Sequence, residues 1–331
     1  MTTETRRLSR AEALDLAHRA CRGAGASEAA AASLAAATVS AEAYGKAAVG
    51  FAHLLDYLTS LTEGRIDGAA EPVVSFPAPA LVQVDARGGI AQLGFDLAFG
   101  ELSARAERYG VAVFAQRNSY TSGELGYYAR RLAAVDLLSL VVSNGPPLIA
   151  PPGATQAAYS TNPIAFAAPG EGRPSLVIDQ ASSAAAFVKI REAAERGEAL
   201  PAGWAIDADG APTTDPIRAL AGALLPFGGA RGANIALMVE VMAAGLTGAN
   251  WSLEAPDFNR GDRSPGAGLL VIAVAPRLFD ASFVLRLETH LQKLEGFGVY
   301  VPGRADAQRE EFLLPVKLFE RVAAFARWRT P

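Results

Sequence analysis

The sequence predicts a fold of the α/β or α+β class with a helical N-terminal region, on the basis of three observations. Apolar residues make up 50% of the 331 residues and charged residues 19%, a composition that can bury a sizeable core. About the first seventy residues show helical periodicity. After them, short apolar runs typical of buried strands alternate with helical segments and Gly/Pro-rich turns.

The N-terminal region is expected to contain three helices. Ser9, with Glu12 three residues later, forms a capping box that predicts the start of the first helix. Gly23–Gly25 interrupts that helix, and Ser27 caps an alanine-rich second one that runs to about Tyr44. A third helix follows, with one apolar face formed by Phe51, Leu54, Leu55 and Leu58. The small side chains allow close helix approach, which fits a helical subdomain or a dimerisation arm.

The rest of the chain is expected to alternate strands with helices. The predicted strands cover residues 81–84, 111–116, 137–143, 164–168, 176–179 and 269–274. The predicted helices cover residues 91–108, 123–132, about 232–244, 283–294 and a last segment from about residue 315. Residues 250–266 lack periodicity and are expected to form a mobile loop.

Charge and composition exclude several classes of function. The net charge of -4 leaves no basic footprint for nucleic acid. Cys21 is the only cysteine, and His18, His53 and His290 lie far apart in the sequence, so we expect no metal site. No apolar run is long enough to span a bilayer, and no apolar segment typical of a secretion signal follows the first basic residues. We therefore expect a cytoplasmic protein that binds neither nucleic acid nor a membrane.

Three polar segments are candidates for ligand binding, and each has a structural alternative. Residues 228–232 (GGARG) precede a helix whose free amides would suit a phosphate or carboxylate, with Arg231 as a bidentate donor. A glycine hinge with a surface arginine is the simpler explanation. Residues 179–183 (DQASS) and 118–124 (NSYTSGE) each follow an apolar strand, where α/β enzymes concentrate ligand contacts. Helix capping explains both segments about as well.

Six segments, taken together, resemble the malate/L-lactate dehydrogenase family. They are residues 118–129 (NSYTSGELGYYA), 160–170 (STNPIAFAAPG), 177–183 (VIDQASS), 203–216 (GWAIDADGAPTTDP), 224–240 (LLPFGGARGANIALMVE) and 301–304 (VPGR). This family also includes sulfolactate, ureidoglycolate and diketogulonate dehydrogenases and piperideine-2-carboxylate reductases. The resemblance extends roughly from Ser9 to Arg327.

The resemblance implies a particular fold and reaction. The fold would be a non-Rossmann NAD(P)-binding domain with a mixed, largely antiparallel sheet, plus a helical N-terminal region, in a homodimer. Residues 1–75 would form the helical or dimerisation region, with residues 305–331 packing nearby, and residues 76–304 the cofactor- and substrate-binding region. Family members transfer hydride between NADPH or NADH and the carbon next to a carboxylate, in a 2-oxo acid or a cyclic imine.

The resemblance also implies which residues form the site. The cofactor would contact Ile178, Asp179, Gln180, Ala181, Ser182, Ser183, Ala230, Arg231, Pro302, Gly303 and Arg304. Residues 161–163 would line the same cleft. Lys46, Ser122 and Asn162 would contact the substrate.

The chain departs from the family pattern where the chemistry would take place. The first family motif typically reads Arg-Gly-x-x-Ser-His-Gly-x-x-Arg, and residues 44–53 match it with Ala48, Val49 and His53 in place of the serine, the histidine and the second arginine. In the second motif, Thr121 replaces a histidine. A carbonyl reduction needs a proton donor for the developing alkoxide, and valine cannot supply a proton. The substrate either lacks the carboxylate that the missing arginine would bind, or its carboxylate is held through Arg231 or Lys46 instead.

Two hypotheses follow from these departures. In the first, the chain is an NAD(P)H-dependent reductase of an imine or a 2-oxo-acid-like metabolite, with Thr121, His53 and Tyr120 as replacement catalytic groups. A protonated imine needs no further proton donor at the hydride step, which favours an imine. In the second, the fold serves a non-redox conversion such as cyclisation or dehydration, or binds a ligand without hydride transfer.

Overall fold

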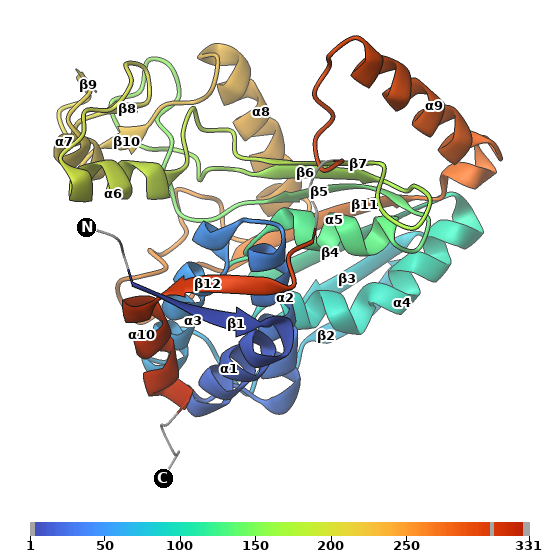
Figure 1. Cartoon of the computed structure of the whole chain (residues 1–331), viewed down its shortest axis with the longest axis horizontal. Helices are drawn as coiled ribbons and strands as arrows, with labels where there is room; N and C mark the ends of the chain where they lie inside the picture. The colour runs from blue at the N-terminus through green and yellow to red at the C-terminus, as the bar shows by residue number, and fades with distance from the viewer. Residues whose placement is uncertain (1–3, 305–307, 327–331) are drawn as a thin grey trace.

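A seven-stranded sheet forms the centre of the molecule (Figure 1). The structure is a computed structural model that describes residues 4–304 and 308–326. Across the sheet the strand order is β2 (Val73–Ala78), β3 (Leu81–Asp85), β4 (Val111–Ser119), β11 (Ala267–Val274), β5 (Leu138–Ser143), β6 (Ile164–Ala168) and β7 (Leu176–Gln180). Neighbouring strands run antiparallel except β3 and β4, which are parallel. The predicted mixed, largely antiparallel sheet is therefore confirmed.

Both faces of the sheet are covered, as the alternation along β11 shows. Leu269 and Val271 belong to the core beneath α4 (Ala91–Tyr109) and α5 (Leu125–Ala133). Leu270 belongs to the core on the opposite face, which is covered by α8 (Ala230–Glu240) and the π-helical turn η2 (Val241–Gly245). Because side chains of a strand alternate between faces, both cores need apolar residues, and the strand is apolar almost throughout.

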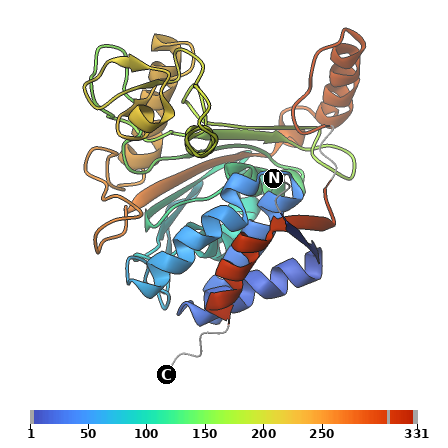
Figure 2. The ribbon, with the colours of Figure 1, turned by 60° about the vertical axis from the view of Figure 1, so that its left-hand side comes forward.

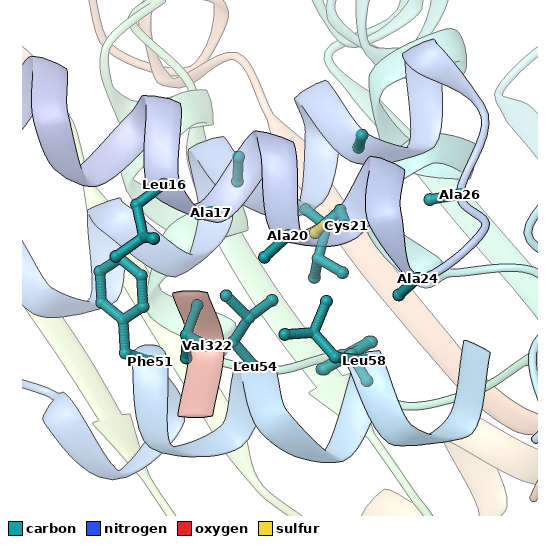
Figure 3. Close-up of a cluster of buried hydrophobic side chains, with 14 of the residues drawn as sticks. Leu16, Ala17, Ala20, Cys21, Ala24, Ala26, Phe51, Leu54, Leu58 and Val322 are labelled. Atoms are coloured by element: carbon teal, nitrogen blue, oxygen red, sulfur yellow. The ribbon is translucent and has the colours of Figure 1, made fainter. Parts of the chain in front are cut away.

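The N-terminal helices pack through small side chains. α1 (Arg10–Gly23), α2 (Glu28–Ala43), the 3-10 turn η1 (Ala47–Val49) and α3 (Phe51–Thr62) form this region together with α10 (Val316–Ala326). Figure 3 shows the alanines of α1 facing Leu54 and Leu58 of α3, with Val322 of α10 beside them. Ser9 forms the predicted capping box with Glu12, and Ser27 caps α2.

A two-stranded sheet joins the two ends of the chain and was not predicted. β1 (Thr5–Ser9) pairs antiparallel with β12 (Glu311–Pro315), which places Leu8 opposite Phe312. The chain that follows β12 continues into α10, which packs on α1 and α3 (Figure 2). Residues 305–307 and 327–331 lie outside the described residues. The division into residues 1–75 and 76–304 stays a prediction, and β2 enters the central sheet at residue 73.

A small lobe, residues 187–224, stands above one end of the sheet (Figures 1 and 2). It contains α6 (Phe187–Arg196), β8 (Ala205–Ile206), β9 (Pro212–Thr213), α7 (Pro216–Leu220) and β10 (Ala223–Leu224). Its core includes Ile190, Leu200 and Leu224. In both views α6 lies on the side of the lobe that faces the N-terminal helices.

A helix at the other end of the sheet stands away from the body (Figure 1). This is α9 (Phe283–Gly296), which follows the short turn η3 (Pro276–Leu278) and buries only Leu291. Phe279 and Phe297, on either side of it, are 73% and 86% exposed. Among residues 4–304 and 308–326, no helix combines the length and apolar character that crossing a membrane requires.

One close backbone approach gives a test of the packing between β11 and η2. A Cβ atom at Gly268 would lie 1.8 Å from the carbonyl oxygen of Ala243, so Gly268→Ala must push the helical turn off the sheet. We expect this change to lower the free energy of unfolding by about 2–3 kcal/mol in urea denaturation. Gly100→Ala, in an open position on α4, should instead raise it by about 0.5–1 kcal/mol. Equal effects of the two changes would contradict the packing described.

Candidate active site

A cavity of about 420 Å³ lies where the N-terminal helices, the edge of the central sheet and the small lobe meet. α3 contributes His53 and Asp56 to its wall, and the loop after β4 contributes Thr121. β7 contributes Asp179, and α6 contributes Arg191. These residues are far apart in the sequence, and the topology brings them together around one space.

His53 is held from both sides of its ring. Its Nδ1 lies 2.8 Å from Oδ2 of Asp56, one turn later on α3, and its Nε2 lies 3.1 Å from Oγ1 of Thr121. The carboxylate accepts a hydrogen bond, so it selects the ring forms that carry a proton on Nδ1. Nε2 is therefore the nitrogen left to exchange a hydrogen bond with the hydroxyl of Thr121.

The Thr121 hydroxyl belongs to a network that reaches α4. Oγ1 lies 2.7 Å from the hydroxyl of Tyr57, which in turn donates to the carbonyl oxygen of Thr121 at 2.8 Å. Gln92 donates to the same tyrosine oxygen at 3.1 Å. Burial raises the pKa of Tyr57 to about 12, so this hydroxyl keeps its proton.

This network has two hydrogen-bonding states that differ by one proton. With Nε2 protonated, His53 donates to Thr121 and Thr121 donates to Tyr57. With Nε2 bare, Thr121 can rotate its proton toward His53. The distances fit both states, so the Asp56–His53–Thr121 group can hold a proton beside the cavity and release it.

A second ionisable group lies on the same wall. Arg130 donates to both carboxylate oxygens of Glu124, at 2.9 and 2.6 Å, and so compensates that buried charge. Asp179 accepts one hydrogen bond from the amide of Gly126 at 3.0 Å. Burial of its carboxyl group raises the pKa of Asp179 to about 6, with the nearby Glu124 as a further cause and Lys46 acting in the opposite direction. Asp179 can therefore change its charge near neutral pH.

Comparison with known proteins identifies the family. The malate/L-lactate dehydrogenase family model matches residues 8–312. The chain belongs to the malate/L-lactate dehydrogenase family. As a member, it is an NAD(P)-dependent oxidoreductase that acts on a small molecule. Of the two hypotheses from the sequence, this supports the oxidoreductase.

The relatives of this family member include dehydrogenases and imine reductases. The (2R)-3-sulfolactate dehydrogenase (NADP(+)) of Chromohalobacter salexigens is 36% identical over 88% of this chain and 89% of its own. The Δ1-pyrroline-2-carboxylate/Δ1-piperideine-2-carboxylate reductase of Pseudomonas syringae pv. tomato is 40% identical over 78% of this chain and 76% of its own. The crystal structure of Δ1-piperideine-2-carboxylate reductase from Pseudomonas syringae pv. tomato superposes with a TM-score of 0.91 at 36% identity. The superposition covers 97% of this chain and 100% of that chain.

Of the catalytic residues predicted from the sequence, the structure brings Thr121 and His53 together and leaves Tyr120 apart. Tyr120 is 0% exposed, and its hydroxyl accepts from Ser60 at 2.9 Å and donates to the carbonyl of Phe258 at 3.0 Å. Phe258 lines the cavity edge-on to His53, with ring centres 6.2 Å apart. Tyr120 therefore anchors the loop that carries Phe258 and does not reach the cavity itself.

Of the three residues predicted to contact the substrate, two line the cavity and one does not. Lys46 and Ser122 line the cavity, as do Thr161 and Pro163. Asn162 does not, because its amide is buried and donates to the backbone of Ala236 and the carboxylate of Glu240. It ties the loop before β6 to α8.

The predicted cofactor residues lie in three connected places. Asp179, Gln180 and Ala181 line the cavity. The hydroxyls of Ser182 and Ser183 bond to backbone carbonyls, and the carbonyl of Ser182 accepts from Phe227, just before the glycine loop.

Ala230 and Arg231 begin α8, and within the described chain their amides find no hydrogen-bond acceptor. Gly228 and Gly229 have positive φ with open space around them. Free amides at a helix start fit a phosphate of NAD(P)H. Gly303 packs against Val177 beside Ile178, and Arg304 forms ion pairs with Glu288 and Glu295, so Pro302, Gly303 and Arg304 support β7 from outside the cavity.

Three residues of the site were missed by the sequence reading. Asp56 could have been found, because it lies three residues after His53 on the same helix face. Arg191 lies on α6, a helix whose start was expected after residues 179–183 but whose length and residues were not predicted. Phe258 lies in the aperiodic segment 250–266, which carried no signal.

The raised pKa of Asp179 predicts a pH-dependent cost in stability. The unfolded carboxyl has its ordinary pKa near 3.8 and the folded one about 6, so the folded state loses stability as the pH rises through this window. Asp179→Asn keeps an acceptor for Gly126, and its stability relative to the native protein should rise between pH 4 and pH 7, to a gain of about 3 kcal/mol above pH 7. Urea unfolding at a series of pH values measures this.

Asp280→Asn is the matched control. The backbone amide of Ser282 lowers the pKa of Asp280, with Arg286 as a further cause, so its ionised form stabilises the fold. This variant should be less stable than the native protein at pH 8, the opposite sign. A pH-independent difference between Asp179→Asn and the native protein would contradict the assignment of a raised pKa.

Proposed function

We propose that this protein reduces a small cyclic imine that bears a carboxylate on the imine carbon, with NADPH or NADH as the reductant. The observation that carries the proposal is the contact of 3.1 Å between His53 Nε2 and Thr121 Oγ1 at the cavity wall. Relatives named as pyrroline- and piperideine-carboxylate reductases support it.

The chemistry of the proton favours an imine over a ketone. An imine nitrogen is far more basic than a carbonyl oxygen and takes its proton before hydride arrives, whereas a carbonyl needs a donor in the transition state. In this proposal Thr121 passes a proton to the imine nitrogen, and His53 Nε2 replaces it. Asp56 stabilises the protonated imidazole during this transfer.

Asp179 supplies the complementary charge. Above about pH 6 its carboxylate is ionised and would stabilise the positive charge of an iminium on the same wall. Glu124 is already paired with Arg130, so Asp179 is the carboxylate on this wall that can stabilise the iminium.

The cofactor would lie between the end of β7 and the start of α8. Bound NAD(P)H supplies the hydride. We infer that Asp179, Gln180 and Ala181 contact its reactive end, and that the amides of Ala230 and Arg231 bind a phosphate. The protein itself holds the imine over Thr121. Phe258 and Ala48, which also line the cavity, help to exclude water from the contact between Thr121 and the imine.

We also propose a homodimer. Exposed apolar side chains gather along α8, η2 and the chain after them: Leu237, Val241, Leu246, Trp251 and Leu253. Exposed apolar groups of this kind are typical of a surface that a partner covers. A second copy of the chain would supply that cover.

The experiment that tests the reductase proposal compares two substrate classes. With NADPH and then NADH, we expect kcat/KM for Δ1-pyrroline-2-carboxylate or Δ1-piperideine-2-carboxylate to exceed that for pyruvate and oxaloacetate by about 100-fold or more, because an imine nitrogen takes its proton before hydride arrives and a carbonyl oxygen takes it only in the transition state. Oxidation of the reduced cofactor is followed by absorbance. Equal or faster turnover of the 2-oxo acids, or turnover of neither class, would sink the proposal.

A further inference from the structure

Most charged groups on the cavity wall are compensated by a neighbour. His53 lies against Asp56 at 2.8 Å. Lys46 lies close enough to Asp179 to lower the pKa of that carboxyl. Neither Lys46 nor Arg191 has a carboxylate of the described chain within ion-pair distance, but Lys46 faces Asp179, whereas no carboxyl group is known to feel the charge of Arg191. It is the cation on this wall that is left for a ligand.

The helix that carries Arg191 holds it in a defined position. On one face of α6, Ile190 and Ala193 are buried in the core of the small lobe. Phe187 packs against the edge of the same core and, with Arg191 four residues later, lines the cavity. The guanidinium carbon lies 5.9 Å from the centre of the Phe187 ring. The packing of one face therefore fixes which side chains α6 presents to the ligand.

The other cations named for a substrate carboxylate fit it less well. Arg231 begins α8 and does not line the cavity. His53 has both ring nitrogens engaged, by Asp56 and Thr121, and Lys46 offers a point charge already facing Asp179. A guanidinium offers two parallel N–H donors that match a carboxylate.

We propose that Arg191 binds the carboxylate of the substrate and that Phe187 covers the ring beside it. This inference rests on the proposed imine reductase function and assigns the specificity for a carboxylated imine to α6. The substrate would then lie with its iminium toward Asp179 and Thr121 and its carboxylate toward the small lobe, a zwitterion matched by opposite charges on two parts of the wall.

The test uses Arg191→Gln and Arg191→Lys in the full-length protein, with Arg196→Gln as the control. Arg196 lies on the same helix, but its ion pairs are with the surface residues Glu192 and Glu198. With Δ1-pyrroline-2-carboxylate, Arg191→Gln should raise KM about 30- to 100-fold while kcat changes little, and Arg191→Lys should restore part of the loss. With 1-pyrroline, which lacks the carboxylate, the variant should match the native protein.

Two further readouts separate this inference from the proposed function. Calorimetry with pyrrole-2-carboxylate, a planar acid that cannot be reduced, should show binding to the native protein and at least about tenfold weaker binding to Arg191→Gln. Titration with NADPH, followed by tryptophan fluorescence, should give the same affinity in both.

An unchanged KM for the carboxylated imine, an equal loss with 1-pyrroline, or failure of the native protein to bind pyrrole-2-carboxylate would each overturn the role of Arg191. Weaker NADPH binding by Arg191→Gln would overturn it too, by assigning the guanidinium to a cofactor phosphate. Binding of pyrrole-2-carboxylate through Arg191 without reduction of any imine would instead contradict the proposed function alone.

Discussion

The imidazole of His53 joins α3 to the loop after β4, and the arrangement of the cavity wall depends on that bridge. Asp56 holds one nitrogen and Thr121 meets the other, while Tyr57 and Gln92 extend the network to α4. Apolar contacts between the N-terminal helices and the rest of the fold set distance but not orientation, and the hydrogen bond from Ser60 to Tyr120 supports the same loop from its buried side. The hydrogen bonds therefore fix where the Thr121 hydroxyl lies relative to a ligand.

Most charged side chains around this bridge are paired with an opposite charge, so few remain to interact with a ligand. A buried ion pair with both oxygens engaged, such as Arg130 with Glu124, removes two charges from the ligand's surroundings. What remains is a carboxyl group at Asp179, with a pKa raised by burial and Lys46 nearby, and a guanidinium at Arg191. In the proposed reaction these two groups select a ligand that carries both a cation and an anion, which an imino acid does and a 2-oxo acid does not.

Local signals in the sequence predicted much of the fold. Ser9 and Ser27 cap their helices as predicted, and α4 ends at Gly110 in a left-handed conformation that suits glycine. The strands at residues 137–143 and 269–274 were recognised because they are buried on both faces and so read as apolar runs. The family resemblance added the mixed sheet, since strand pairing is not a local property.

Features that depend on distant partners were missed. β1 is a polar five-residue segment that becomes a strand because β12, about three hundred residues later, lies beside it. Tyr120 and Asn162 read as ligand contacts, yet tertiary packing buries the first under Phe258 and turns the second toward Glu240. The sequence shows which side chains are polar. Which of them face a cavity is decided by the packing of elements that come from elsewhere in the chain.

Proton transfer from Thr121 to the imine nitrogen is tested most directly with a substrate that does not need to be protonated. N-methyl-Δ1-pyrrolinium-2-carboxylate carries a permanent iminium charge, so Thr121 has no proton to deliver to it. Thr121→Val should lower kcat about 100-fold with Δ1-pyrroline-2-carboxylate and leave kcat with the N-methyl compound nearly unchanged, with Thr289→Val on α9 as the control. An equal loss on both substrates would mean that Thr121 only supports the structure, and no loss on either would mean that the proton comes from another group.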